Sequence, residues 1–200
     1  MGLRERKAAR TRAQIVDVAV ETFLAQGYDE TTMEQIAEAA EVGTSTLYRY
    51  FPSKDLLILD RLIDTLDLAH RLRERPADEP PDVSLGAVLT TAAEQFGDPA
   101  LRIPELRRVI DAAPVPRARL WDLVLQSRAD FEGVLAERMG LPADDISVRF
   151  TAGITLDVFQ VVDEERKRDP HRDYADVVRR VLERLQAANL LLPAAGTRVA

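Results

Sequence analysis

The chain has 200 residues, a length that suits one compact domain or two small ones. Hydrophobic residues make up 46% and charged residues 30%, a balance that excludes disordered and collagen-like chains. The absence of cysteine excludes disulfides, thiolate metal sites and cysteine nucleophiles. Acidic residues interrupt the apolar stretch that would follow a signal peptide's basic start, and no uncharged run reaches the length of about 18 residues needed to span a membrane. We therefore expect a water-soluble protein of the cytoplasm.

The net charge of -7 argues, taken alone, against a nucleic-acid partner, because contacts to phosphates dominate that kind of affinity. The charge is unevenly distributed, however. Up to Lys54 the positive residues lie at the two ends of the segment, whereas the remaining chain carries 20 Lys and Arg against 26 Asp and Glu. This division predicts an N-terminal domain of residues 1–54 and a more acidic C-terminal domain of residues 55–200.

Apolar residues recur at helical spacing through almost the whole chain and alternate like a strand nowhere, which predicts an all-α fold. A first helix ends before Gly27, and Thr31 and Thr32 can each cap a short second helix. A third short helix follows a break at residues 41–43 and is stopped by Pro52. Ser53 then caps a long fourth helix.

A proline-rich and acidic surface loop, Pro76–Asp82, follows the fourth helix, and a helical bundle follows the loop. About nine helices are expected in all, with order ending at Pro193. The predicted bundle helices are Ser84–Phe96, Pro104–Ala113, Val115–Met139, Ala143–Lys167 and Tyr174–Leu190.

Three short helices, with a tight turn between the second and the third, are the arrangement of a helix-turn-helix DNA-binding domain. Only Val42, Leu47 and Phe51 would anchor the third helix. Its other residues are polar or aromatic: Thr44, Ser45, Thr46, Tyr48, Arg49 and Tyr50. A solvated face explains the polarity but not the crowding of two tyrosines and an arginine, because exposed aromatic groups usually have a partner.

The stretch Ile15–Leu57 resembles the N-terminal domain of the tetracycline-repressor (TetR) family of bacterial transcription regulators, notably in G-Y, T-T, I-A, T-L-Y-R-Y-F and S-K-D-L-L. The resemblance covers about the first third of the chain, and the nine-helix plan is also that of the family. It implies a homodimeric repressor that binds a palindromic operator and is released by a small-molecule inducer. The sequence departs at Glu41, where members often have glycine in the turn. Because positive φ costs a residue other than glycine about 1–2 kcal/mol, either Glu41 is strained or Gly43 takes that conformation.

The resemblance also implies which residues touch DNA. Thr44 and Ser45 would face the groove, and Arg49 would either read guanine or hold the backbone. The expected phosphate contacts are Thr46, Tyr48, Tyr50, Lys54 and the backbone amide of Thr32. The arginines before residue 13 form either an arm that contacts DNA or a disordered, solubilising end.

The last two long helices are expected to form the dimer interface in the family's manner, although an intrachain core would explain their apolar residues equally well. Bulky and polar residues of the bundle are candidates for an inducer pocket, and each could instead be plain core: Phe96, Trp121, Arg128, Phe131, Phe150, Asp157, Phe159 and Gln160. Asp157 lies among apolar neighbours, so its carboxylate should need a cationic partner such as Arg128, Arg149 or a ligand. The segments LRRVIDAAPVPRARLWDLVLQ and AERMGLPADD resemble C-terminal domains of mycofactocin-regulator type, which implies an acyl-CoA-like effector.

The sequence lacks the glycine-rich phosphate loops and the G-x-S-x-G motif of common enzymes. His70 and His171 are the only histidines, and Asp67 with His70 supplies just one of the two such pairs that a di-iron bundle needs. We therefore expect no catalysis, metal or cofactor. A helical adaptor that binds only protein partners is the alternative, although it leaves the tyrosine-rich helix without a role.

Overall fold

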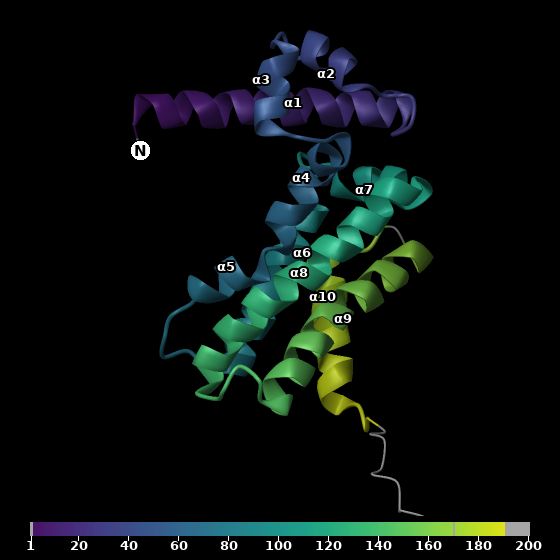
Figure 1. The fold of residues 1–200 in the computed structure, drawn as a ribbon. Coiled ribbons are helices and arrows are strands. Elements are labelled where there is room, and N and C mark those ends of the chain that lie inside the picture. Colours follow the sequence, from purple (N-terminus) through teal and green to yellow (C-terminus); the bar gives the residue numbers. More distant parts are fainter. Residues whose placement is uncertain (1, 170, 191–200) are drawn as a thin grey trace, which may run out of the picture.

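A computed structural model describes residues 2–169 and 171–190 of the chain (Figure 1). The described part consists of helices without strands, as predicted, but it has ten helices where about nine were expected. The end of order expected at Pro193 lies outside the described residues. The helices are α1 (Leu3–Gln26), α2 (Met33–Ala39), α3 (Thr44–Tyr50), α4 (Lys54–Leu66), α5 (Leu68–Arg73), α6 (Pro81–Gly97), α7 (Ile103–Ala112), α8 (Pro114–Met139), α9 (Ile146–Arg168) and α10 (Tyr174–Ala187).

The additional helix arises because the long fourth helix breaks at Asp67. The backbone of Asp67 leaves the helical region, with ψ at 72°, and its carboxylate accepts a hydrogen bond of 3.0 Å from the backbone N–H of His70. Asp67 therefore caps α5, so the spacing that resembles a metal-ligand pair serves as a helix cap. Within the described residues, no three His, Asp or Glu side chains are grouped so that they could hold a metal ion.

The helices α1, α2 and α3 form a head that lies across one end of the molecule, and α4 leads from it into the bundle (Figure 1). The core of the head is not closed off from the bundle, because Ile103, Leu106 and Ile110 of α7 and Leu120 of α8 belong to the same buried cluster as the apolar residues of α1–α4. The domain boundary expected after Lys54 falls in the first turn of α4, and this core continues across it.

Two further cores hold the bundle together. One joins α5, α6, α8 and α9, and the other joins α6, α9 and α10. Val177, Val178 and Val181 of α10 are buried in the second of these cores, against α6 and α9 of the same chain. These three valines of α10 therefore belong to an intrachain core, and the part of the last two helices in a dimer interface stays a prediction. None of the helices in the described part of the chain is long and apolar enough to cross a membrane.

The turns of the head show which capping predictions hold. Of the two predicted caps of α2, Thr31 and Thr32, it is Thr32 that caps the helix, in a capping box with Gln35. Glu41 has a φ of 54°, whereas Gly43 has a φ of -65°, so the strain of the turn lies on Glu41. Ser53 precedes α4 as expected, but its side chain makes no capping hydrogen bond.

Candidate nucleic-acid interface and ligand pocket

Helix α3 presents one face outward and buries the opposite one. Leu47 is completely buried, and Phe51 at the end of the helix is 2% exposed. At 100° per residue, Ser45 and Arg49 lie nearly opposite Leu47, with Tyr48 and Thr44 toward one flank, and all four are exposed. Tyr48 keeps 44% of its surface in solvent. The outward face of α3, defined by these four residues, thus carries two hydroxyls, a phenol and a guanidinium on an anchored helix.

The other two predicted contacts of α3 lie on its flank. Thr46 and Tyr50 are half-buried, and the ring of Tyr50 packs against the core of the head. The guanidinium carbon of Arg49 lies 5.6 Å from the centre of the Tyr50 ring. Stacking of this kind limits the directions that the guanidinium can take, which pre-orients it at the edge of the outward face.

Thr32 and Lys54 are placed differently from the prediction. The backbone N–H of Thr32 already donates a hydrogen bond of 2.8 Å to Gln35 Oε1, so its amide is not available to a phosphate. Lys54 Nζ donates to the backbone carbonyls of Tyr28 and Thr31, at 2.7 and 2.8 Å, and lies 4.1 Å from the centre of the Tyr28 ring. Burial raises the pKa of Tyr28 to about 12, and Asp55 adds to the shift. Lys54 therefore secures the α1–α2 turn, with one of its three donors left over.

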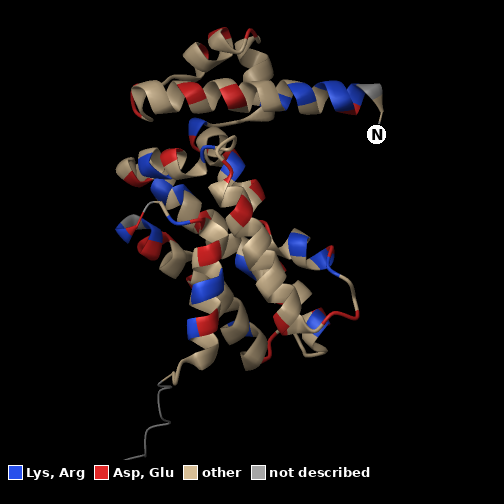
Figure 2. Ribbon diagram, turned by 180° about the vertical axis from the view of Figure 1, so that it is seen from behind, with Lys and Arg blue, Asp and Glu red and all other residues tan. Residues whose placement is uncertain are grey.

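The basic residues before position 13 belong to α1 and do not form a disordered end. Arg4, Arg6, Lys7 and Arg10 are exposed on the part of α1 that extends beyond α2 and α3 (Figures 1 and 2). Arg12 is different, because its guanidinium makes a two-pronged ion pair with Asp60 of α4 and lies over the Phe51 ring, 4.8 Å from its centre. The exposed basic segment thus consists of four cations, and Arg12 is a structural residue.

Asp60 is a buried carboxylate at the junction of α1 and α4. Burial raises its pKa, and the hydrogen bond and charge of Arg12 oppose that shift. The pair therefore fixes the angle between the basic end of α1 and the helix that enters the bundle.

Two further arginines tie the head to the start of α7. Arg61 Nη1 donates to the backbone carbonyl of Leu101 at 3.0 Å, and its other terminal nitrogen pairs with Asp17 of α1. Arg102, which has a left-handed φ of 52°, donates to Glu21 of α1 at 2.7 Å. We refer to these contacts as the α1–α7 latch. They connect α1 and α4 to the start of α7.

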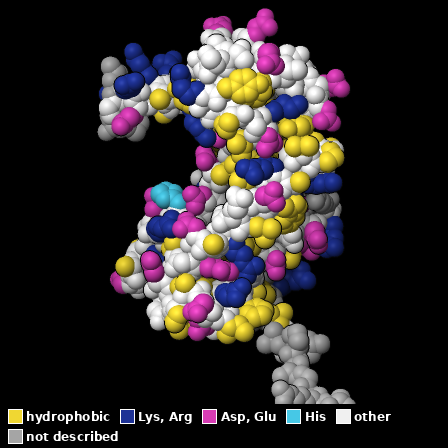
Figure 3. All heavy atoms as spheres, viewed as in Figure 1, with side chains coloured by type: hydrophobic (Ala, Val, Ile, Leu, Met, Phe, Trp, Pro, Cys, Tyr) yellow, Lys and Arg dark blue, Asp and Glu magenta, His cyan; other side chains and the backbone are white. Residues whose placement is uncertain are grey.

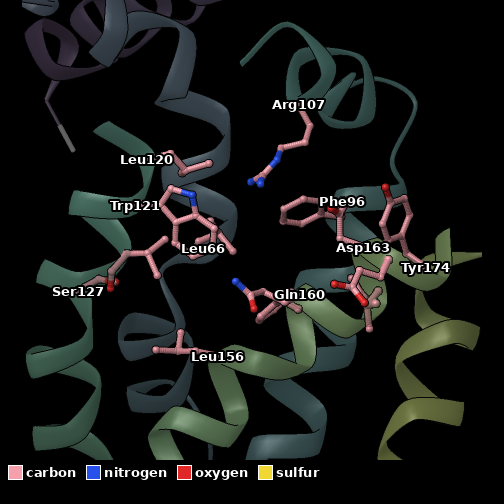
Figure 4. Close-up of a pocket in the computed structure, with 15 residues that line it drawn as sticks. Leu66, Phe96, Arg107, Leu120, Trp121, Ser127, Leu156, Gln160, Asp163 and Tyr174 are labelled. Atoms are coloured by element: carbon pink, nitrogen blue, oxygen red, sulfur yellow. The ribbon is translucent and has the colours of Figure 1, made fainter. Parts of the chain in front are cut away.

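A cavity of about 260 Å³ lies inside the bundle (Figure 4). Four of the residues predicted from the sequence line it: Phe96, Trp121, Phe159 and Gln160. The remaining lining comes from α4 and α6–α10: Leu66, Ala93, Arg107, Leu120, Val124, Ser127, Leu156, Val162, Asp163, Glu164 and Tyr174. The wall is mainly apolar with a few polar groups, which is the usual composition of a small-molecule site.

The other four predicted pocket residues do not line this cavity. Phe131 is 2% exposed and belongs to the core that joins α5, α6, α8 and α9, whereas Phe150 is 64% exposed on the outside of α9. Asp157 lies on the same exposed side of α9, so in the single chain its carboxylate is open to solvent. Arg128 is paired with Glu132 at 2.7 Å and donates to the backbone carbonyl of Arg149.

Arg107 is the most important of the lining residues that were not predicted from the sequence. It lies four residues after Ile103 and three before Ile110, so a cation occupies the apolar face of α7. That interruption is visible in the sequence and could have marked Arg107. Leu66 and Tyr174 gave no such signal, because they reach the cavity only through the packing of α4 and α10.

Helix α9 carries an unpartnered apolar stripe on its outer side. Ile146, Phe150, Ile154 and Val161 follow one another at near-helical spacing and are between 39% and 67% exposed. Leu125 of α8, which packs beside α9, is 65% exposed. Hydrophobic side chains are visible at the surface of the bundle in Figure 3. For a chain of this size, such a row of exposed apolar residues is typical of a protein–protein interface.

A helix-turn-helix head joined to a helical bundle with an internal cavity defines a class of DNA-binding regulators. Residues 15–60 match the model of the bacterial regulatory proteins of the tetR family. Over 173 residues the chain is 35% identical to the HTH-type transcriptional regulator TcmR of Streptomyces glaucescens, and the match covers 82% of this chain and 76% of TcmR. The chain therefore belongs to the TetR family of transcriptional regulators.

Two other comparisons agree with this assignment. MftR of Mycobacterium tuberculosis, whose name refers to mycofactocin biosynthesis, is 34% identical over 79 residues, which cover 34% of this chain and 40% of MftR. The structure of the repressor FadR of Thermus thermophilus, in complex with lauroyl-CoA, shares the fold with a TM-score of 0.60 and 23% identity, over 93% of this chain and 98% of FadR. The mycofactocin-type C-terminal domain stays a prediction.

Proposed function

We propose that this protein is a ligand-responsive transcriptional repressor of the cytoplasm that binds a palindromic operator as a homodimer. It acts by binding alone and not as an enzyme. The observation that carries the proposal is the outward face of α3, where Thr44, Ser45, Tyr48 and Arg49 are exposed on a helix that Leu47 anchors. Hydroxyl and guanidinium groups suit base edges and phosphates in a major groove.

The remaining phosphate contacts come from the periphery of that face. In this proposal, Thr46 and Tyr50 on the flank of α3 and the third donor of Lys54 contact the DNA backbone, and Thr32 does so through its hydroxyl, because its amide already bonds Gln35. The basic segment of α1 adds Arg4, Arg6, Lys7 and Arg10. These cations offset the overall charge of -7 locally, at the end of the molecule where DNA would bind (Figure 2).

A homodimer forms, in this proposal, through the apolar stripe of α9. One head reads too few base pairs to select a site, and a two-fold axis would place two heads on related half-sites. The stripe is the largest run of exposed apolar residues on a helix in the described part of the chain, with Ile146, Phe150, Ile154 and Val161. Burial of these side chains against their copies would remove them from water.

An effector bound in the cavity would change the affinity for DNA. Leu66 of α4 and Arg107 of α7 line the cavity, and the α1–α7 latch connects those same helices to α1. A ligand that fits the cavity better in a second arrangement of α4 and α7 would shift the protein toward that arrangement, and a coupling of about 1–3 kcal/mol suffices. Occupancy of a promoter is enough for repression, so release by the ligand would induce transcription.

Selection of bound fragments from genomic DNA, followed by gel shift, tests the proposal. We expect enriched fragments to share a two-fold symmetric sequence with half-sites about one helical turn, or a multiple of it, apart. The double variant Thr44→Ala, Ser45→Ala should lose this preference, and Asp122→Ala, a control at an exposed position on α8, should keep it. A wild-type chain that retards no fragment would overturn the proposal and favour the helical adaptor.

A further inference from the structure

The cavity has aromatic walls with one cation between them. Figure 4 shows Trp121 on α8 and Phe96 on α6 on opposite sides, with the guanidinium of Arg107 entering between them and Gln160 approaching from α9. Phe159 extends the aromatic wall, since its ring centre lies 6.2 Å from that of Phe96. Flat aromatic walls favour a flat apolar group over a branched one.

Arg107 has hydrogen-bonding capacity that the chain does not use. Its Nε lies 3.1 Å from Asp111 Oδ1 on the same helix, but the N–H is not directed at an acceptor and is buried. Within residues 2–169 and 171–190, Asp111 is the only partner of this guanidinium. A guanidinium has five N–H donors in a planar fork that matches a carboxylate or a sulfonate. The donors of Arg107 that face the cavity are therefore free to bind an anion.

A second hollow adjoins the first and is rimmed by further cations. It shares Phe96, Arg107, Asp163 and Tyr174 with the cavity and adds Arg108 and Arg166, together with Pro104 and Asp111. The guanidinium carbon of Arg166 lies 4.2 Å from the centre of the Tyr174 ring. Of the acids near the two hollows, Asp111 lies against Nε of Arg107, Asp163 has an interaction of its own within the chain, and Glu164 is exposed.

We propose that the cavity binds an organic anion with a flat, aromatic body, whose anionic group pairs with Arg107 while the rings lie between Trp121 and Phe96. This inference rests on the proposed ligand-responsive function and names the ligand class of the same site. The volume of about 260 Å³ is just below the usual range for ligand pockets, roughly 300–1,000 Å³. It therefore suits a compact ring system better than the long chain and nucleotide head of the acyl-CoA-like effector expected from the sequence.

The anion would act on the helix that controls the head. Arg107 lies on α7, and the latch residues Leu101 and Arg102 immediately precede that helix. An anion that draws Arg107 toward the cavity pulls on the same helix, whose start holds Glu21 of α1 through Arg102 and holds Arg61 of α4 through the Leu101 carbonyl. The charge of the ligand and the position of α1 are thereby connected through one element.

Two fluorescent probes that differ only in charge test the proposal on the full chain. 8-Anilino-1-naphthalenesulfonate carries the anionic group, and N-phenyl-1-naphthylamine has the same rings without it. We expect Arg107→Gln to raise the Kd of the sulfonate roughly ten-fold or more and that of the neutral amine less than two-fold. Trp121→Ala should weaken both probes, and Arg180→Gln, an exposed arginine on α10, should change neither. Arg107→Lys, which keeps the charge but not the fork, should retain part of the sulfonate binding.

A sulfonate Kd that Arg107→Gln does not change, or an equal loss for both probes, would overturn the role of Arg107. A displacement assay then distinguishes a ligand with aromatic rings from one with an aliphatic chain. 2-Naphthoate should displace the sulfonate at concentrations at least ten-fold lower than dodecanoate or lauroyl-CoA. The reverse order would overturn the aromatic part of the proposal. A gel shift of the wild type without any probe tests the proposed function separately from the proposed ligand class. Intact operator binding without a role for Arg107 defeats only the ligand class, whereas absent operator binding defeats the proposed function.

Discussion

Lys54 shows how a side chain expected at a phosphate is used inside the head. Its ammonium lies over the Tyr28 ring and donates to the carbonyls of Tyr28 and Thr31. These two hydrogen bonds leave one of its three donors for DNA. The sequence predicted the cation but not these partners, because they depend on the path of the turn between α1 and α2. Much of the outward face of α3 was predictable, since helical spacing alone separates Leu47 from Ser45 and Arg49.

Lys54→Met should therefore have two effects. Loss of the donors removes a charged hydrogen bond from each of two carbonyls, which should lower the free energy of unfolding by about 1–3 kcal/mol in urea titrations. Loss of one phosphate contact should flatten the log–log salt dependence of operator binding by about 0.9. Lys7→Met, on the exposed segment of α1, should flatten the slope without the loss of stability. A Lys54→Met protein with the wild-type slope would show that Lys54 acts only within the head.

Glu41 carries backbone strain that a glycine would relieve. Its φ of 54° places Cβ against the following carbonyl, at a cost of about 1–2 kcal/mol. Glycine removes that cost but adds entropy to the unfolded chain, so Glu41→Gly should stabilise the protein by up to about 1 kcal/mol in denaturant unfolding. The matched change Glu38→Gly, inside α2, should destabilise by about 1 kcal/mol. Equal losses in the two variants would contradict the strain at Glu41.

At the scale of elements, helix positions were predictable, but the break between α4 and α5 was not. Apolar residues continue at helical spacing through residue 72, and nothing in that spacing shows that the Asp67 carboxylate turns back to the His70 N–H. Packing also decides the start of α6, which begins at Pro81 inside the predicted loop. A proline is tolerated in the first turn of a helix because its missing N–H would have no partner there.

The connection between α5 and α6 is held by a polar network with one acid at its centre. Glu79 accepts from Arg75 and from Ser84, at 2.7 Å for the hydroxyl, and Arg138 of α8 donates to Ser84 and to the carbonyl of Leu72. The hydrogen bond from Arg75, followed by that from Ser84, lowers the pKa of Glu79 to about 2. The ionised form is thus favoured in the folded state.

Glu79→Gln should make stability less sensitive to acid. Because the folded pKa of Glu79 is below the unfolded value, its contribution is fully present above about pH 4.5 and is lost as the pH falls toward about 2. The difference in Tm between wild type and Glu79→Gln should therefore be constant near neutral pH and shrink through that window. Glu30→Gln, at an exposed acid in the α1–α2 turn, serves as the control. A difference that is flat from pH 7 to pH 2 would contradict the role of Glu79.

At the scale of the molecule, the cavity was the feature least accessible from the sequence. Phe96, Trp121, Phe159 and Gln160 were found because bulky groups on a bundle helix often face its interior. Phe150 has the same chemistry and points outward, since the choice depends on which side of α9 meets α8 and α10. The side of α9 that does not pack against these helices is left exposed as the apolar stripe, and a second copy can bind there.

Phe150→Glu should therefore convert the proposed dimer into monomers. Phe150 lies within the apolar stripe of α9 and is 64% exposed in the single chain, so a carboxylate there is tolerated in the monomer but would be buried without a partner in the dimer. Sedimentation velocity should show half the wild-type mass at micromolar concentration, with unchanged thermal unfolding of the monomer, and gel shifts should show much weaker operator binding. Val83→Glu introduces the same charge at an exposed apolar residue on α6 and should leave the dimer intact. If Phe150→Glu stays dimeric while Val83→Glu dissociates, the two copies meet through α6 and not through α9.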